Sequence, residues 1–295
     1  PFEVEDPWYS MYQSEDLPER GVHYGEGKPL FHAALRDKYG TERLSEDEWT
    51  EIRRVYYGMV SRVDSQFGRV MQALESIGGT DNTLVIYLTD HGEYLGDFGL
   101  IEKWPSGMDR CLLQNPLIMA GPGVKEGVTA STFTEMVDIL PTLLDQAEIE
   151  VGHTHFGRSL TPALLNPRAT VREQAFSEGG FSLDELGLLE ISSGEYANKA
   201  NLQHEHPELV GKTIALRDEQ YTFVYRLYEN NELYDRAIDP DETINRIDSR
   251  ELQSVALDMQ ARVQDWLVQS ADVIPWQADP RFPKIPHGKH DDFHY

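Results

Sequence analysis

The stretch from Ser45 to Ile77 constrains the fold of this chain more than any other part of the sequence. Its apolar side chains recur mostly every three or four residues, which places them on one stripe of a long α-helix. Ser45 and Glu48 have the spacing of a capping box, and Gly78 and Gly79 follow the last apolar position. The sequence therefore predicts one long helix from about residue 45 to 77, with one face buried.

Two short apolar runs follow this helix. Residues 83–88 read TLVIYL and residues 116–120 read PLIMA, and such uninterrupted runs are typical of strands buried on both faces of a parallel sheet. Asp138 can cap a further helix that carries Pro141 in its first turn and ends near residue 147. Helix, strand, strand and helix predict an α/β fold with a mostly parallel central sheet flanked by helices.

The pattern changes after about residue 170. Short antiparallel strands are predicted at 213–216, 221–227 and 232–234, with a turn at Asn230-Asn231 and a helix at 250–268. We therefore expect an α/β part over residues 1–170, and a smaller antiparallel α+β subdomain with a surface tail over residues 171–295. Residues 1–44 show little periodicity and are expected to be irregular.

The charge of the chain restricts its classes of partner. Its 295 residues carry a formal net charge of −25, so most of its surface repels polyanions and no nucleic acid partner is expected. The sequence has no apolar run of the length that crosses a bilayer, so we expect no membrane span. The single cysteine, Cys111, cannot form an internal disulfide and is interpreted as a small apolar residue that leads into a strand.

An acid and an imidazole stand side by side where the first predicted strand ends. Asp90 and His91 follow the apolar run, and ligands of open α/β sheets bind at the carboxyl ends of the strands. Carboxylate and neutral imidazole both bind divalent metals well. Adjacent strand residues point to opposite faces, but Gly92 permits a turn that lets both reach one ion. We therefore predict that both side chains turn toward a common cavity.

Lys103 lies further along the same loop, beyond Gly96 and Gly99. These glycines give the loop the freedom to fold back, and a lysine there brings a positive charge to an anionic group beside the metal. Both features have a structural alternative: strand ends carry Asp and Gly as turn formers, and most lysines are simply solvated.

Several segments are similar, in order and spacing, to the sulfatase family of the alkaline phosphatase superfamily. NTLVIYLTDHGEYLGDFGLIEKW (82–104) resembles the strand that carries the family's later metal ligands, and residues 56–78 resemble the helix before it. Further similar segments are NPLIMAGPGV (115–124), MVDILPTLLDQAEI (136–149), FGRSLTPALL (156–165) and ELYDRAIDPDETIN (232–245). The likeness covers most of residues 45–270 and implies an alkaline-phosphatase-like fold.

The resemblance implies roles for three residues. Asp90 and His91 match the family's two later metal ligands, and Lys103 matches the lysine that contacts the transferred sulfate or phosphate. Histidine at the second position is similar to the iduronate-sulfatase, choline-sulfatase and phosphonate-monoesterase branches. The implied cofactors are one divalent metal, usually Ca²⁺ with Mn²⁺ or Mg²⁺ as alternatives, and a formylglycine nucleophile.

Two parts of the family's site have no match in this sequence. Residues 1–89 contain no C-x-P-x-R signature, from which formylglycine is made, and Cys111 stands in a different context. Residues 1–82 contain no buried strand followed by an acidic pair. We therefore expect this chain to be the C-terminal part of the enzyme, inactive alone and partnered by a missing N-terminal segment or chain. A homo-oligomer is compatible with this interpretation.

Other polar residues have weaker claims to a functional role. Asp109 and Arg110 either line a substrate pocket or form a structural ion pair, and Glu178 opens a glycine loop that can reach the rim of the site. The histidines outside the main motif are expected to be surface residues, because a zinc site needs three or four ligands: His153, His155, His204, His206, His287, His290 and His294.

Three functions compete at this point. The first is metal-dependent hydrolysis of a sulfuric ester, carried by a small molecule or a saccharide. The second is hydrolysis of a phosphonate monoester or a phosphodiester on the same fold, which Asp90, His91 and Lys103 would serve equally well. The third is a non-catalytic binding module that has kept the fold, an alternative motivated by the unmatched nucleophile.

Overall fold

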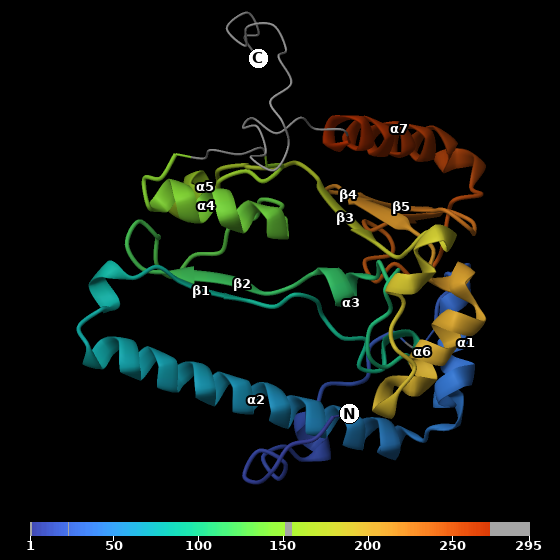
Figure 1. Ribbon diagram of the computed structural model, residues 1–295, viewed down its shortest axis with the longest axis horizontal. Helices are drawn as coiled ribbons and strands as arrows, with labels where there is room; N and C mark the ends of the chain where they lie inside the picture. Colours follow the sequence, from blue (N-terminus) through green and yellow to red (C-terminus); the bar gives the residue numbers. More distant parts are fainter. Residues whose placement is uncertain (1, 23, 151–154, 272–295) are drawn as a thin grey trace, which may run out of the picture.

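The computed structural model describes residues 2–22, 24–150 and 155–271. Its larger part has three layers (Figure 1): the helix α2 (Glu46–Ser76) lies on one side of the strands β1 (Val85–Leu88) and β2 (Leu117–Ala120), and the helices α4 (Ile139–Gln146) and α5 (Thr161–Leu165) lie on the other side. Helices on both faces of a sheet confirm the predicted α/β class. None of the helices in the described ranges is long and apolar enough to cross a bilayer.

The long helix α2 has the predicted ends. The Ser45 hydroxyl accepts a hydrogen bond from the Glu48 backbone N–H, and the Glu48 carboxylate accepts one from the Ser45 N–H, which completes the capping box. Gly78 has a left-handed φ of 69° just beyond the helix end.

The prediction that the whole apolar stripe of α2 is buried was wrong for its C-terminal half. Val60, Val63 and Val70 are 51%, 48% and 64% exposed, whereas Trp49 near the N-terminal end is buried. The reason is tertiary: the N-terminal segment packs on the first half of the helix, where Tyr12 contacts Tyr57 and Ser61. In the second half, Phe67 packs against Tyr87 of β1.

The pairing of the first two strands also differs from the prediction. β1 and β2 are antiparallel, with Val85 opposite Ala120 and Leu88 opposite Leu117, and β1 is only half-buried. A parallel pair needs a crossover connection, usually a helix packed on the sheet. The connection here contains the 3₁₀ turn η4 (Asp97–Gly99) and the four-residue helix α3 (Arg110–Leu113) but no longer helix, so the chain returns beside the strand it left.

The second sheet confirms the predicted antiparallel subdomain. Its strand order is β3-β4-β5-β6, formed by β3 (Ala175–Gly179), β4 (Thr213–Arg217), β5 (Tyr221–Arg226) and β6 (Glu232–Asp235). The helix α7 (Gln253–Ser270) covers one face of this sheet (Figure 1), where Ala256, Met259 and Val263 pack against Leu216, Phe223 and Leu233. The strands β4 to β6 and the helix α7 were predicted from the sequence, whereas β3 was not.

The expectation that residues 1–44 are irregular was wrong for the helix α1 (Leu30–Tyr39). Phe31 and Leu35 are fully buried, and Gly40 ends the helix with a left-handed φ of 67°. α1 packs against α6 (Ala197–Glu205), so the N-terminal region contacts the C-terminal subdomain directly. We retain the division near residue 170 as a proposal, since this contact crosses it.

Single turns of 3₁₀ helix connect the larger elements. They are η1 (Ser14–Asp16), η2 (Thr41–Arg43), η3 (Thr80–Asn82), η4 (Asp97–Gly99), η5 (Met136–Asp138), η6 (Leu183–Leu188), η7 (Gly194–Tyr196), η8 (Pro207–Val210) and η9 (Arg250–Leu252). Asp138 does not cap α4 with its side chain as predicted: its buried carboxylate instead pairs with Arg172 and accepts backbone N–H groups of Glu135 and Arg158.

Candidate functional site

The candidate site begins where β1 ends, at Asp90 and His91. The backbone after His91 is tightly packed against α3. A Cβ atom on Gly92 would lie 1.9 Å from the carbonyl oxygen of Cys111. The Gly92 N–H also donates to the Leu112 carbonyl at 2.8 Å. Glycine is therefore required by the close approach of α3, and not by the conformational freedom that the sequence analysis assumed.

The ring of His91 has a defined orientation. Its Nδ1 lies 2.7 Å from the Gly92 carbonyl oxygen, so Nδ1 carries the proton and donates it there. The lone pair is then on Nε2, the atom that points away from the backbone contact. Histidines that bind metals commonly donate their other ring N–H to a carbonyl in this way.

Asp90 presents its carboxylate on the same side as His91 Nε2. The Asp90 Oδ2 atom is 3.5 Å from His91 Nε2, and Oδ1 accepts the His91 backbone N–H at 3.0 Å. Two ligand atoms of one calcium ion at right angles to each other would be roughly 3.3–3.7 Å apart, given bond lengths of about 2.3–2.6 Å. The pair therefore has a separation that suits two ligands of one divalent ion.

Lys103 reaches the same place. Its Nζ atom donates to His91 Nε2 at 2.6 Å, so a carboxylate, an imidazole and an ammonium converge at the end of β1. The convergence agrees with the prediction, but the setting is open: the side chains of Asp90 and His91 are 86% and 36% exposed. Within the described residues the three groups therefore lie on a surface and not in an enclosed cavity.

The loop between His91 and Lys103 folds back as the glycines predicted. Gly96 and Gly99 have φ values of 105° and 69°, in the left-handed region. The non-glycine residues Leu95, Phe98 and Glu102 also adopt positive φ, which costs backbone energy and persists only where packing imposes it.

Two buried oxygen atoms beside Asp90 have no hydrogen-bond partner among the described residues. They are Thr89 Oγ1 and Asn115 Oδ1, and the amide of Asn115 also donates to the Asp90 carbonyl at 3.2 Å. Buried polar atoms are normally paired, so each of these two oxygens has an unused capacity to accept a hydrogen bond. Neither residue stands out in the sequence, because asparagine and threonine are common in the turns that follow strands.

The donor set fits part of a hard-metal site. Oxygen ligands and one imidazole suit calcium, magnesium or manganese. In the described ranges, however, no cluster of three or more His, Cys, Asp or Glu side chains is arranged to hold an ion. Asp90 and His91 are therefore two candidate ligands, fewer than a complete site for such an ion requires.

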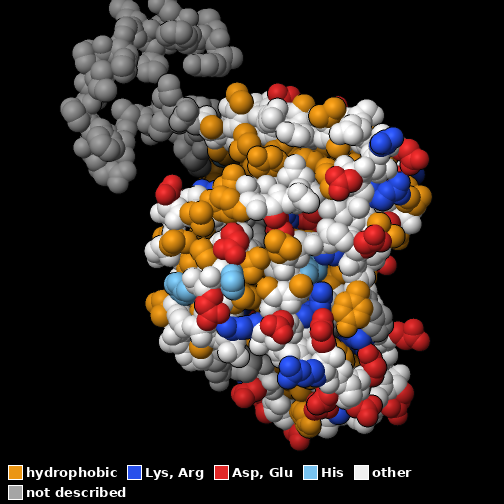
Figure 2. Space-filling model, turned by 90° about the vertical axis from the view of Figure 1, so that its right-hand side faces the viewer, with side chains coloured by type: hydrophobic (Ala, Val, Ile, Leu, Met, Phe, Trp, Pro, Cys, Tyr) orange, Lys and Arg blue, Asp and Glu red, His pale blue; other side chains and the backbone are white. Residues whose placement is uncertain are grey.

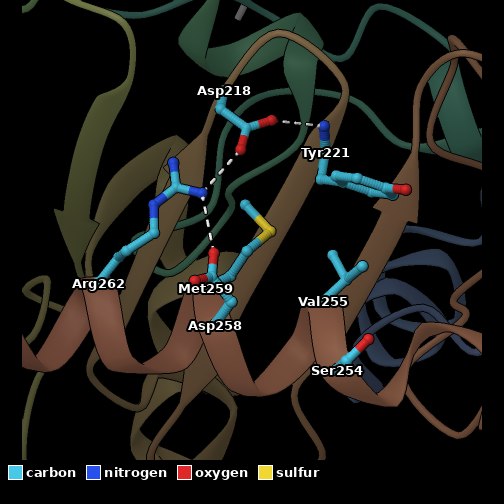
Figure 3. Close-up of a pocket in the computed structure, with 7 residues that line it drawn as sticks. All are labelled: Asp218, Tyr221, Ser254, Val255, Asp258, Met259 and Arg262. Atoms are coloured by element: carbon cyan, nitrogen blue, oxygen red, sulfur yellow. Dashed lines mark hydrogen bonds and ion pairs between the residues drawn. The ribbon is translucent and has the colours of Figure 1, made fainter.

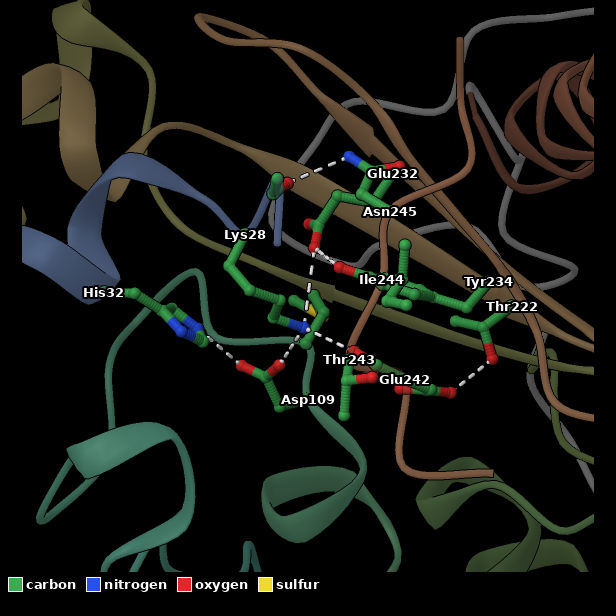
Figure 4. Close-up of polar contacts among 12 residues, drawn as sticks. Lys28, His32, Asp109, Thr222, Glu232, Tyr234, Glu242, Thr243, Ile244 and Asn245 are labelled. Atoms are coloured by element: carbon green, nitrogen blue, oxygen red, sulfur yellow. Dashed lines mark hydrogen bonds and ion pairs between the residues drawn. The ribbon is translucent and has the colours of Figure 1, made fainter. Parts of the chain in front are cut away.

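Asp109 forms a structural ion-pair network and not the wall of a pocket (Figure 4). Its buried carboxylate lies 2.6 Å from Lys28 Nζ and 3.0 Å from His32 Nε2, and it accepts the Tyr94 hydroxyl at 2.5 Å. Burial alone would raise the pKa of Asp109, but Lys28 and His32 hold it well below its usual range. Arg110 is exposed and donates to Gln114, outside this network.

The glycines after Glu178 contact the segment that follows Lys103. The Gly180 N–H donates to the Pro105 carbonyl at 2.9 Å, two residues beyond Lys103. A Cβ atom on Gly179 would lie 2.4 Å from the same carbonyl oxygen, so this contact requires glycine. The end of β3 thus touches the Lys103 loop through its backbone.

The remaining candidates have structural surroundings. His204 contacts the Glu190 carbonyl and His206 contacts the Glu208 carboxylate, whereas His153, His287, His290 and His294 lie outside the described residues. His155 belongs to no metal cluster in the described ranges. Burial raises the pKa of the Cys111 thiol, and nearby carboxylates reinforce this, so Cys111 is a protonated, partly buried residue as expected.

A hollow beside α7 does not compete with this site. A shallow hollow of about 280 Å³ beside α7 (Figure 3) is lined by charged groups that pair with one another, since Arg262 contacts Asp218 and Asp258 at 2.9 and 3.4 Å. On the face shown in Figure 2, acidic side chains are scattered with basic ones between them, as the net charge implies.

Comparisons with known proteins point in one direction. Residues 8–149 match the family model described as Sulfatase. The multifunctional alkaline phosphatase superfamily protein PehA of Trinickia caryophylli is 25% identical over 92% of this chain and 54% of its own length. The N-acetylglucosamine-6-O-sulfatase of Bacteroides thetaiotaomicron is 34% identical over 58% of this chain and 28% of its own length.

A solved structure shows the same fold over most of the chain. The phosphonate monoester hydrolase of Agrobacterium radiobacter superposes with a TM-score of 0.69 at 26% identity, and the match covers 91% of this chain and 54% of that one. These two proteins match more than 90% of this chain, but the chain spans only about half the length of each of them.

Proposed function

Because this chain belongs to the sulfatase family, we propose that it forms part of a metal-dependent sulfuric-ester hydrolase, with Asp90, His91 and Lys103 at the edge of the active site. The observation that carries the proposal is the convergence of these three groups, in which His91 Nε2 lies 3.5 Å from Asp90 Oδ2 and 2.6 Å from Lys103 Nζ. Carboxylate, imidazole and ammonium are the groups needed to hold a cation and an oxyanion side by side.

The three residues have distinct roles in this proposal. Asp90 Oδ2 and His91 Nε2 would bind a divalent cation, which would take the place of the Lys103 N–H at Nε2. The Gly92 carbonyl keeps the proton on Nδ1, so that the Nε2 lone pair is available to the cation. When bound, the cation supplies Lewis-acid stabilisation of charge on the ester oxygens. Lys103 donates its N–H groups to the anionic group and neutralises charge as the ester bond breaks. Calcium is our first candidate for the metal, with manganese and magnesium as alternatives.

The catalytic nucleophile is assigned to residues outside this chain. The chain spans about half the length of its relatives, and its described residues hold too few ligands for a complete metal site. We propose that a formylglycine and the remaining ligands come from a further segment or chain of the same enzyme, and that residues 1–295 alone do not turn over substrate. A sulfated saccharide or another small sulfate ester is the proposed substrate.

A second candidate function is hydrolysis of phosphonate or phosphate esters. It is favoured by the structural match to a phosphonate monoester hydrolase, which extends over 91% of this chain. The same three side chains would serve it, because sulfate and phosphonate esters share tetrahedral anionic groups.

Relative rates on the two ester classes test the proposal. The full-length enzyme is assayed with an aryl sulfate, an aryl phosphonate monoester and an aryl phosphodiester that share one leaving group. The proposal expects the highest kcat/KM on the sulfate. A dominant rate on the phosphorus esters would establish the second function. No turnover of any of the three esters would contradict both hydrolase functions and favour the non-catalytic binding module.

Replacing Asp90 with alanine in the full-length enzyme is expected to weaken metal binding by at least about tenfold, the scale of losing one group that supports a metal site. The readout is the metal content of the dialysed protein, measured by elemental analysis without reference to activity. Asp64→Ala, which removes an exposed carboxylate from α2, is the matched control and should keep the metal. Equal metal content in both variants would remove Asp90 from the ligand set.

A further inference from the structure

The segment directly after Lys103 is unusually well anchored. Residues 104–109, called here the anchored segment, are almost entirely buried, with Trp104, Ser106 and Met108 exposed by 4% or less. Lys103 itself is exposed. The residue with the proposed chemical role thus stands immediately before a buried segment, and the contacts of that segment determine where it stands.

One carbonyl group accepts two hydrogen bonds from the anchored segment. The Leu209 carbonyl, in η8, accepts the indole N–H of Trp104 at 2.8 Å and the hydroxyl of Ser106 at 3.0 Å. The stacked ring of Phe31 lies against Trp104, with the ring centroids 5.8 Å apart. The side chain next to Lys103 is therefore held in one orientation.

Two arginines of the C-terminal sheet, the buried Arg226 and the partly buried Arg217, hold the backbone of the same segment. Arg226, on β5, donates to the Ser106 carbonyl at 3.0 Å, and Arg217, on β4, donates to the Met108 carbonyl at 2.7 Å. Each guanidinium is in turn paired with a buried carboxylate, Glu232 at 2.5 Å for Arg226 and Glu242 at 2.8 Å for Arg217. Pairing of this kind fixes the planar arginine groups in place.

On its other side Lys103 follows a residue with a strained backbone. Glu102 has a φ of 66°, and its carboxylate accepts the Tyr39 hydroxyl at 3.2 Å while its carbonyl accepts the Tyr94 N–H at 3.3 Å. A non-glycine residue keeps such a conformation only where its surroundings impose it. The backbone of Lys103 is thus constrained from both directions, while its side chain is exposed and contacts His91 Nε2.

We infer that Trp104, Ser106 and Arg226 are positioning residues that hold Lys103 beside the anionic group of the substrate. The C-terminal sheet thereby supports this part of the active site. The inference rests on the proposed role of Lys103. A small misplacement of a catalytic group strongly lowers the rate of the chemical step, by up to about a hundredfold for 1 Å. A change in the anchored segment should therefore lower kcat while KM changes little.

A double-mutant cycle in the full-length enzyme tests the inference. Trp104→Phe removes the hydrogen bond to Leu209 and keeps an aromatic ring, and we expect it to lower kcat about tenfold. In a Lys103→Ala background the same substitution should change kcat by less than about twofold, because its effect passes through Lys103. Ser106→Ala, which removes the other hydrogen bond to Leu209, provides a second variant with the same expected pattern.

Trp266→Phe is the matched control, since Trp266, on α7, stacks on Phe176 of β3 and does not belong to the anchored segment. It should leave kcat unchanged. The inference is overturned if Trp104→Phe and Ser106→Ala lower kcat equally with and without Lys103, which indicates a general structural role, or if they behave like the control. If Lys103→Ala alone leaves turnover unchanged, the proposed function fails at Lys103, a result separable from these because it appears in the single variant.

Discussion

Replacing Lys103 with alanine in the full-length enzyme is expected to lower turnover by roughly two to three decades, the scale seen when one stabiliser of transition-state charge is removed. The Lys103 ammonium lies 2.6 Å from His91 Nε2, beside the proposed metal ligands, so its loss removes positive charge at the anionic group. The metal content should not change, because lysine is not a ligand. Steady-state kinetics and elemental analysis of the same preparation measure the two quantities.

Lys125→Ala is the control for this variant, because Lys125 is an exposed lysine on a different surface loop. Its turnover should equal that of the parent. A Lys103→Ala enzyme within a factor of about three of the parent would place Lys103 outside the mechanism.

Replacing Asp109 with alanine is expected to destabilise the protein by about 3–5 kcal/mol, the cost of leaving a buried charge without its partner. Asp109 accepts contacts from Lys28 at 2.6 Å, His32 at 3.0 Å and Tyr94 at 2.5 Å, all within the core. The melting temperature should fall by about 10 °C, given roughly 2–4 °C per kcal/mol for proteins of this size class.

Adding Lys28→Met to Asp109→Ala should recover part of this loss, because the stranded ammonium is then removed as well. If Asp109→Ala alone does not fold, recovery of folding in the double variant would still show that the unpaired Lys28 charge causes the loss. Glu205→Ala, which breaks the exposed ion pair with Lys38, is the control and should change stability by about 1 kcal/mol or less. If Asp109→Ala and Glu205→Ala had the same melting temperature, the network would not contribute to stability.

The same network makes stability depend on pH in a defined direction. Burial lowers the pKa of His32, so the unfolded chain binds a proton first and stability should decline as the pH falls below about 6.5. The pKa of Asp109 is held low by Lys28 and His32 against the effect of burial, so its contribution is present above about pH 4 and is lost below that. Thermal melts between pH 3 and pH 8 measure both the loss of stability due to His32 and the loss due to Asp109. A parent with a flat profile between pH 7 and pH 5 would contradict the His32 part.

The helix α2, the strands β4 to β6 and the helix α7 could be predicted from the sequence because their signals are local. A capping box such as Ser45 with Glu48 acts within one turn, and a stripe repeating every three or four residues acts within one helix. The convergence of Asp90, His91 and Lys103 was also predictable, from the glycines of the loop between them and from the resemblance to the sulfatase family.

Other features depended on contacts between distant segments. The antiparallel pairing of β1 with β2 follows from a connection that lacks a crossover helix, and an apolar run reads alike in either direction. The same limit explains why α1 was missed, since Phe31 is buried against Trp104, far along the chain.

By itself the sequence determined which residues have the chemistry for an anion and metal site, because side-chain type and loop freedom are written in it directly. Only the tertiary structure decided that Gly92 is needed for the close approach of α3, that Asp109 belongs to a buried ion-pair network, and that Lys103 precedes a segment held by the C-terminal sheet. The physical reason is that burial, charge pairing and backbone anchoring are properties of neighbours in space. The residues that supply them here, Lys28 and Arg226 among them, stand far from Lys103 in the chain.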